Sequence, residues 1–97
     1  MPWQTGFEWN IAKAAANHKK HGVRFEHAVA AFDDPFAVIE LDDSEEYGED
    51  RFLLTGRAGG VIIVVVFTDR KERVRIISAR EATEYERRNY FRAAQDD

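Results

Sequence analysis

A row of cations with a histidine beside it is the first feature of the sequence that points to chemistry. Lys13, Asn17, Lys20 and Arg24 lie four, three and four residues apart, so on a helix they would share one face, and His21 directly follows Lys20. An imidazole can accept or donate a proton near neutral pH. The row therefore predicts contact with a polyanion, or else a solvated helix face whose basic end complements the helix dipole.

A second candidate group surrounds Arg80. Ser78, followed by Glu81 three residues later, matches a capping box and predicts that a last helix runs over about residues 79–93. Arg80 would then lie in the first helical turn, where unpaired backbone N–H groups favour an anion, and would help to hold a phosphate. The alternative is an ordinary ion pair between Arg80 and Glu84, worth about 0.3–0.5 kcal/mol.

Residue types and spacing argue against a metal site and against disulfides. The chain has no cysteine, which excludes a disulfide framework and a thiolate-bound zinc ion. His18 and His21 share a predicted helix without the glutamate of a zinc-protease motif between them. We therefore expect no metal and no cofactor. His18 shares a helix face with Ile11 and Ala14, which places it at the edge of the core in this interpretation.

The charges are unevenly distributed along the 97 residues, a length that we interpret as one domain over residues 1–97. The net charge is −4, which by itself disfavours a nucleic-acid partner. Six of the 18 acidic residues fall within residues 42–50, so the rest of the chain has 14 basic and 12 acidic residues. We expect this acidic segment to be a loop that is simply solvated, that repels RNA, or that meets a basic partner.

No segment has the composition of a membrane span. The longest apolar run, Val61–Phe67, is far shorter than the roughly 20 residues that a span requires. The first residues also lack a basic stretch followed by an apolar one, which a secretory signal would have. We therefore expect a cytoplasmic protein without membrane contact.

Periodicity and turn residues predict an α+β fold with two N-terminal helices, an antiparallel meander of three to four strands and a C-terminal helix. Gly59 and Gly60 separate two apolar runs and predict a hairpin whose second strand is the centre of the sheet. The helices should pack on one face of the sheet. The expected strands and helices lie at about residues 7–9, 11–20, 24–32, 36–41, 51–57, 61–68, 73–77 and 79–93.

Together these residues resemble the BrnT family of toxins over about residues 7–90. The most specific segments are Lys20-His21-Gly22-Val23 and Arg75-Ile76-Ile77-Ser78-Ala79-Arg80, in this order. The resemblance also rests on Phe7-Glu8-Trp9, Lys13, Asn17, Phe25, Asp34-Pro35, Arg51, Gly56, Ala82, Glu86, Arg87 and Tyr90. Asn10 departs from the family pattern, which has Asp there, although Asn remains a good N-cap.

The resemblance implies a RelE-like α+β fold and a ribonuclease activity that halts translation and growth. It also implies a partner, a BrnA-type antitoxin that neutralises the toxin and contacts operator DNA through its own ribbon-helix-helix domain. The toxin would then reach operator DNA only through the antitoxin, and its own substrate would be RNA.

RNA cleavage without a metal ion needs a proton acceptor for the 2′-hydroxyl, cations for the phosphorane and an acid for the 5′-oxygen. We assign proton transfer to His21 and phosphate neutralisation to Lys20 and Arg80, with Arg51 as a further cation and Glu86 as a reserve base. The side chains expected to bind substrate are Lys13, Asn17, Arg24 and Arg75. The alternative is a non-enzymatic nucleic-acid or protein interaction module, acting with a DNA-binding partner, in which the same cations merely hold phosphates.

Overall fold

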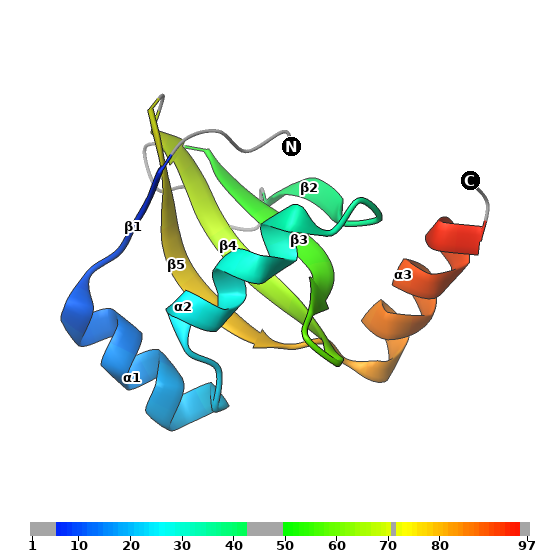
Figure 1. Cartoon of the computed structure of the whole chain (residues 1–97), viewed down its shortest axis with the longest axis horizontal. Helices are drawn as coiled ribbons and strands as arrows, with labels where there is room; N and C mark the ends of the chain where they lie inside the picture. Colours follow the sequence, from blue (N-terminus) through cyan, green and yellow to red (C-terminus); the bar gives the residue numbers. More distant parts are fainter. Residues whose placement is uncertain (1–5, 43–49, 71, 96–97) are drawn as a thin grey trace.

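The strands form one mixed sheet in the order β1-β5-β4-β3-β2 (Figure 1). The structure is a computed structural model, and it describes residues 6–42, 50–70 and 72–95. The elements in chain order are β1 (Gly6–Glu8), α1 (Ile11–His21), α2 (Phe25–Ala28), the 3₁₀ helix η1 (Val29–Asp33), β2 (Val38–Asp42), β3 (Arg51–Ala58), β4 (Val61–Arg70), β5 (Arg73–Glu81) and α3 (Glu84–Gln95). The α+β class predicted from the sequence is confirmed.

The central meander follows the predicted pattern. Strands β3, β4 and β5 pair antiparallel, and β4 is the middle strand of the sheet. Ile63, Val64 and Val65 are at most 2% exposed, because the sheet is covered on both sides at its centre. The turn between β3 and β4 places Gly59 at φ 62°, a left-handed conformation that glycine adopts without steric cost.

The sheet is larger and less regular than the sequence indicated. It has five strands where three to four were expected, and it is mixed where an antiparallel meander was expected. The difference lies in β1, which pairs parallel to β5 with Phe7 opposite Val74. A strand of three residues shows little periodicity, and its direction is set by the helices that connect it to the meander, so local sequence does not reveal the pairing.

The predicted start of the last helix is wrong. Ser78 and Arg80 lie in β5, which continues to Glu81 because it pairs with β4 as far as the contact between Glu81 and Ile63. The sequence contains a second capping box further on, and the structure uses that one. Thr83 accepts a hydrogen bond from the backbone N–H of Glu86, which in turn accepts one from the Thr83 N–H.

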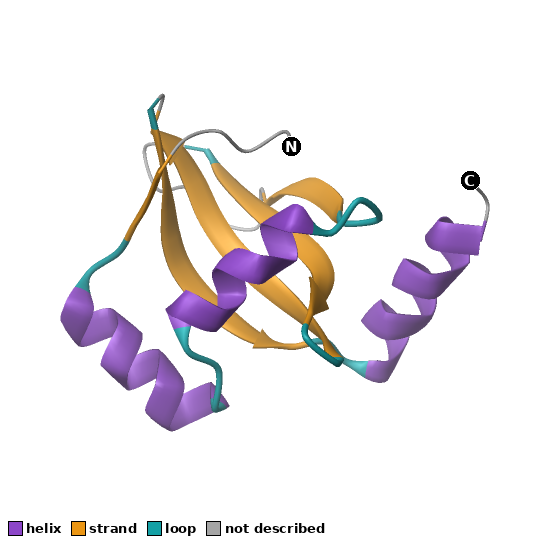
Figure 2. Cartoon of the chain, viewed as in Figure 1, coloured by secondary structure: helices purple, strands orange, loops and turns teal. Residues whose placement is uncertain are grey.

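The N-terminal helices cover one face of the sheet, here called the first face. Figure 2 shows α2 and η1 crossing in front of the strands. Phe25, Phe32 and Phe67 are buried beneath them, with the rings of Phe32 and Phe67 5.1 Å apart in an edge-to-face arrangement. The second predicted helix is therefore present, but it continues as a 3₁₀ turn from Val29.

Helix α1 begins and ends as predicted but packs differently. Asn10 caps its N-terminus through the N–H of Lys13, and Gly22 ends it at φ 74°. Of the row assigned to its core side, only Ala14 packs against the core, because Ile11 is 83% exposed and His18 is also exposed. The interpretation of His18 as a residue at the core edge is therefore wrong.

Asn17, expected on the basic face, is the buried residue of α1. Its side-chain amide donates to the carbonyl of Ala79 (2.8 Å) and to that of Val23 (3.0 Å) and accepts from the N–H of Ala79 (3.1 Å). It thereby pairs with the edge of β5 as a neighbouring strand would. This contact, together with the burial of Asn17, attaches α1 to the sheet.

No helix in the described part of the chain is long and apolar enough to cross a membrane. The acidic segment lies mostly outside the described residues, because residues 43–49 are not among them.

Replacing Asn17 by Ala should lower the free energy of unfolding by about 2–3 kcal/mol, because it leaves the buried N–H and C=O of Ala79 without partners. Urea unfolding of the variant measures this loss. The matched control is Lys13→Ala, on the exposed side of the same helix, which should change stability by less than about 0.5 kcal/mol. Equal stabilities of the two variants would contradict the role given to Asn17.

Candidate active site

The candidate site begins on the face of the sheet opposite α2 and η1, here called the second face. Val65 and Ala79 are paired and buried on the first face. Their neighbours Val64 and Arg80 are also paired and, by the alternation of side chains along a strand, lie on the second face. Arg80 therefore projects from a rigid strand, and not from the first turn of a helix.

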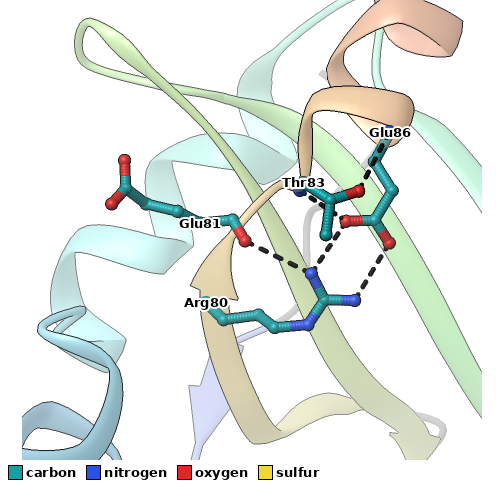
Figure 3. A network of polar contacts seen from close by, with 4 residues as sticks. All are labelled: Arg80, Glu81, Thr83 and Glu86. Atoms are coloured by element: carbon teal, nitrogen blue, oxygen red, sulfur yellow. Dashed lines mark hydrogen bonds and ion pairs between the residues drawn. The ribbon is translucent and has the colours of Figure 1, made fainter.

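Arg80 and Glu86, which the sequence assigned to one site, are in direct contact. The two guanidinium nitrogens Nη1 and Nη2 donate to the two carboxylate oxygens of Glu86 at 2.8 and 2.9 Å, and Nη1 also donates to the carbonyl of Glu81 at 3.2 Å. Figure 3 shows this bidentate ion pair across the junction between β5 and α3. The expected pairing of Arg80 with Glu84 is wrong, since Glu84 binds Arg88 instead.

The ion pair controls the ionisation of Glu86. Hydrogen bonds from Arg80 lower the pKa of the Glu86 carboxyl to about 2 against the effect of its partial burial, and hydrogen bonds at Thr83 act in the same direction. The same contact raises the pKa of the Arg80 guanidinium. A carboxylate held this firmly in its charged form is a weak proton acceptor at neutral pH, which argues against Glu86 as a base and favours a role in orienting Arg80.

A second arginine on this face is also paired with a carboxylate. Arg75 donates through Nη1 to Glu8 at 2.9 Å, and Arg73 lies 4.0 Å from the same carboxylate. Arg51 begins β3 on the same face, opposite Asp42 of β2, and is half-buried. The sheet thus holds three of the predicted cations, Arg51, Arg75 and Arg80, on one surface.

The remaining predicted cations lie at α1 and are not joined to this surface. Lys13, Lys20, His21 and Arg24 are exposed, and their side chains form no hydrogen bond or ion pair within the described residues. Because Asn17 contacts Ala79, the last turn of α1 lies beside the end of β5 (Figure 1). His21 is therefore near the strand that carries Arg80, but no contact links the two side chains.

A cleft of about 390 Å³ lies between α3 and the second face, next to the Arg80–Glu86 pair. Its floor comes from β2, β3 and β4, and its wall from the first three turns of α3 and the residue before it. Its lining side chains are Val38, Glu40, Leu53, Thr55, Val64, Thr83, Tyr85, Glu86, Asn89, Tyr90 and Ala93. The sequence did not point to Glu40, Tyr85 or Asn89. With the helix start placed correctly, the spacing of four residues between Tyr85 and Asn89 would have placed those two on one face.

Described His, Asp and Glu side chains form no cluster of three or more that could hold a metal ion. The sequence contains no cysteine that would add to one.

A family model described as the ribonuclease toxin BrnT of type II toxin–antitoxin systems matches residues 9–86. The chain belongs to the BrnT family. The matched range includes all nine residues that the sequence assigned to the site, and it ends at Glu86, the partner of Arg80. No curated protein matches the chain.

In this BrnT-family chain, α3 is held to the rest of the fold mainly by polar contacts. The hydroxyl of Tyr90 donates to Asp34 at 2.5 Å, and Asp34 also accepts from the backbone N–H of Arg57 at 2.7 Å. Partial burial raises the pKa of Asp34, but these hydrogen bonds and one from Phe36 outweigh it, so that the pKa is lowered overall. Phe91 adds a contact beneath the guanidinium of Arg57, 5.8 Å from the ring centre.

Replacing Glu86 by Gln should lower the free energy of unfolding by about 1–2 kcal/mol at pH 7, a figure reduced for solvent screening because the side chains of Arg80 and Glu86 are 39% and 28% exposed. The pKa of Glu86 is lower in the folded state, so this stabilisation is present above the ordinary carboxyl pKa and is lost on acidification. The difference from the wild type should therefore vanish between about pH 5 and pH 2.

Unfolding curves recorded across this pH range test the prediction. Glu84→Gln is the matched control, since it removes the same charge from the same helix but breaks a pair that is 81% and 68% exposed. That variant should differ from the wild type by less than about 0.5 kcal/mol at every pH. A pH-independent effect of Glu86→Gln would show that the charge of Glu86 contributes nothing.

Proposed function

We propose that this BrnT-family chain is a metal-independent endoribonuclease that arrests translation and growth in the cytoplasm. The observation that carries the proposal is the Arg80–Glu86 pair, which borders a cleft on the second face of the sheet. Membership of a family of ribonuclease toxins supports RNA as the substrate.

Arg80 binds the scissile phosphate in this proposal. A guanidinium has five N–H donors, and Glu86 and the Glu81 carbonyl engage three of those of Arg80, which leaves two for phosphate oxygens. Glu86 keeps the group in one orientation, so its donors are aimed before the substrate arrives. Such preorganised donors stabilise the additional charge of the phosphorane as it forms.

The chemical step is transesterification. The 2′-oxygen attacks phosphorus, the bond to the 5′-oxygen breaks, and the products are a 2′,3′-cyclic phosphate and a 5′-hydroxyl. His21 is the group that we assign to proton transfer, because its exposed imidazole lies on the turn of α1 that follows the contact with β5. The RNA strand would pass over the end of β5, with its phosphates near Lys20 and Arg24.

The other predicted residues take supporting roles. Lys13 extends the cationic row on α1, and Arg51 and Arg75 extend the cationic surface of the sheet towards β1 and β3. Asn17 is left out of the proposed site, because its amide is buried and occupied by the backbone of Ala79 and Val23.

One observation favours the non-enzymatic alternative. His21 has no partner within the described residues to fix its ring, and Glu86 is already engaged, so neither is held as a ready base. A protein that only holds phosphates would need no such base.

Replacing His21 by Ala should reduce the rate of RNA cleavage at least about 100-fold and leave RNA affinity nearly unchanged, because a proton-transfer group acts in the chemical step. Replacing Arg80 by Ala should reduce both the rate and the affinity, because the phosphate loses its donor. Cleavage of a labelled RNA, with and without EDTA, and binding of a 2′-O-methyl RNA measure the two effects separately.

The matched control for Arg80 is Arg88→Ala, which breaks an arginine–glutamate pair on α3 outside the cleft. It should cleave RNA at a rate close to that of the wild type. Cleavage that persists in His21→Ala would remove His21 from the mechanism, and cleavage that EDTA abolishes would overturn metal independence. A wild type that binds but never cleaves RNA would establish the interaction module instead.

We also propose that the partner is a BrnA-type antitoxin with a ribbon-helix-helix domain, through which the complex contacts operator DNA. Family membership supports an antitoxin, and the exposed cations of α1 give it a surface to neutralise. An antitoxin that acts by covering the site should protect Lys20, His21 or Arg80.

Amide and lysine labelling of the complex should therefore show protection at the last turn of α1 or at the end of β5, and cleavage should stop at one antitoxin per toxin. Inhibition with unchanged accessibility of all three residues would contradict this and would require an effect at a distance. Residues of the exposed side of α2, such as Glu26, provide the internal reference for labelling, because they lie outside the proposed site.

A further inference from the structure

We propose that the cleft between α3 and the second face binds one unstacked guanine base of the RNA, at the nucleotide whose phosphate Arg80 holds. This inference rests on the proposed ribonuclease function and adds to it the base at which cleavage occurs. It is carried by three side chains that line the cleft and that have no evident structural task, namely Glu40, Tyr85 and Asn89.

The cleft has the size and walls of a base-binding site. Its volume of about 390 Å³ falls within the range of about 300–1,000 Å³ found for small-molecule sites. Val38, Leu53 and Val64 provide an apolar floor, on which the faces of a planar base would replace water. The cleft is partly open to solvent, so that a base swung out of a single strand can enter it.

Tyr85 supplies an aromatic wall. It is 72% exposed although it lines the cleft, so its ring does not contribute to the core. Exposed aromatic side chains are common stacking partners of single-stranded bases. Such stacking strengthens binding but does not distinguish one base from another.

Glu40 and Asn89 supply the discrimination. Both side chains line the cleft, and neither forms a hydrogen bond or ion pair within the described residues. A carboxylate only accepts hydrogen bonds, and its two oxygens match two parallel donors. Guanine alone presents such a pair, at N1–H and the 2-amino group, whereas the other bases place an acceptor beside each donor. The amide of Asn89 can donate to the guanine O6 or N7.

The position of the cleft links base recognition to cleavage. Glu86, which binds Arg80, and Thr83, which binds Glu86 (Figure 3), also line the cleft. A guanosine whose base lies in the cleft would therefore carry its own phosphate to Arg80. Cleavage next to guanosine is the expected consequence.

The test uses 2′-O-methyl oligonucleotides, which cannot be cleaved because they lack the attacking hydroxyl. Each has one test nucleoside, guanosine, inosine, adenosine or cytidine, within a uridine strand. The wild type should bind the guanine strand at least about tenfold more tightly than the adenine and cytosine strands, since one bidentate contact discriminates by roughly 1–3 kcal/mol. Inosine, which lacks the 2-amino group, should bind more weakly than guanine.

Glu40→Gln should abolish the preference for guanine, because an amide offers one acceptor and one donor where the carboxylate offers two acceptors. The matched control is Glu72→Gln, which removes the same charge at the exposed turn between β4 and β5 and should keep the preference. Tyr85→Ala should weaken binding of every strand by a similar factor of about 5 or more, and Tyr85→Phe should recover most of this loss.

Mapping of the cleaved ends of a natural RNA separates this inference from the proposed function. Wild-type cleavage next to guanosine that becomes unselective in Glu40→Gln supports both. RNA cleavage with no preference for guanosine, or a preference that Glu40→Gln leaves intact, overturns the guanine subsite and leaves the ribonuclease function standing. Absence of any cleavage by the wild type overturns the proposed function.

Discussion

The pairing of β5 with β4 as far as Glu81 fixes the position of the candidate site. Because side chains alternate along a strand, this ladder turns Ala79 towards the first face and Arg80 towards the second. It also presents the outer edge of β5 to the amide of Asn17, which attaches α1, and it delays the start of α3 until after Thr83. A shorter strand would lose the ion pair at one face and the contact with α1 at its edge, so both halves of the proposed site depend on the same backbone hydrogen bonds.

The cations on the two sides of β5 differ in how they are compensated. On the sheet, Arg75 and Arg80 each bind a carboxylate, so their charges add little to a long-range field but their donors are held in fixed directions. At the end of α1, Lys20 and Arg24 are exposed and make no ion pair within the described residues. Uncompensated charges attract a polyanion from a distance, whereas oriented donors act on one phosphate. In a protein of net charge −4, a polyanion would therefore be attracted mainly by the cations of α1, and the arginines of the sheet would orient its phosphates.

The features that the sequence predicted correctly are those set by neighbouring residues. Asn10 and Gly22 delimit α1, and Gly59 forms the central hairpin, because caps and tight turns depend on a few adjacent side chains. The failures concern long-range contacts. Ser78 had the local pattern of a helix start, but the pairing of β5 with β4 outweighed that pattern. Asn17 had the spacing of a surface residue, but its hydrogen-bond partner Ala79 lies 62 positions away. Arg80 and Glu86 were assigned to the site because of the chemistry of their side chains, which the sequence shows directly. Their contact could not be predicted, because it depends on where β5 ends.

The cleft exists because α3 is attached to the rest of the fold by a few polar contacts and not along an apolar face. Tyr90 is the one buried residue of this helix, all of which is described, and its hydroxyl is bound to Asp34, which also accepts from the N–H of Arg57. An apolar helix face packed flat on the sheet would have filled the space between them. Polar contacts of Glu86 and Tyr90 instead hold α3 beside the sheet and leave the cleft between the two. The wall that carries Tyr85 is thereby held opposite the floor that carries Glu40, by the pair of Glu86 with Arg80 and the hydrogen bond of Tyr90 to Asp34.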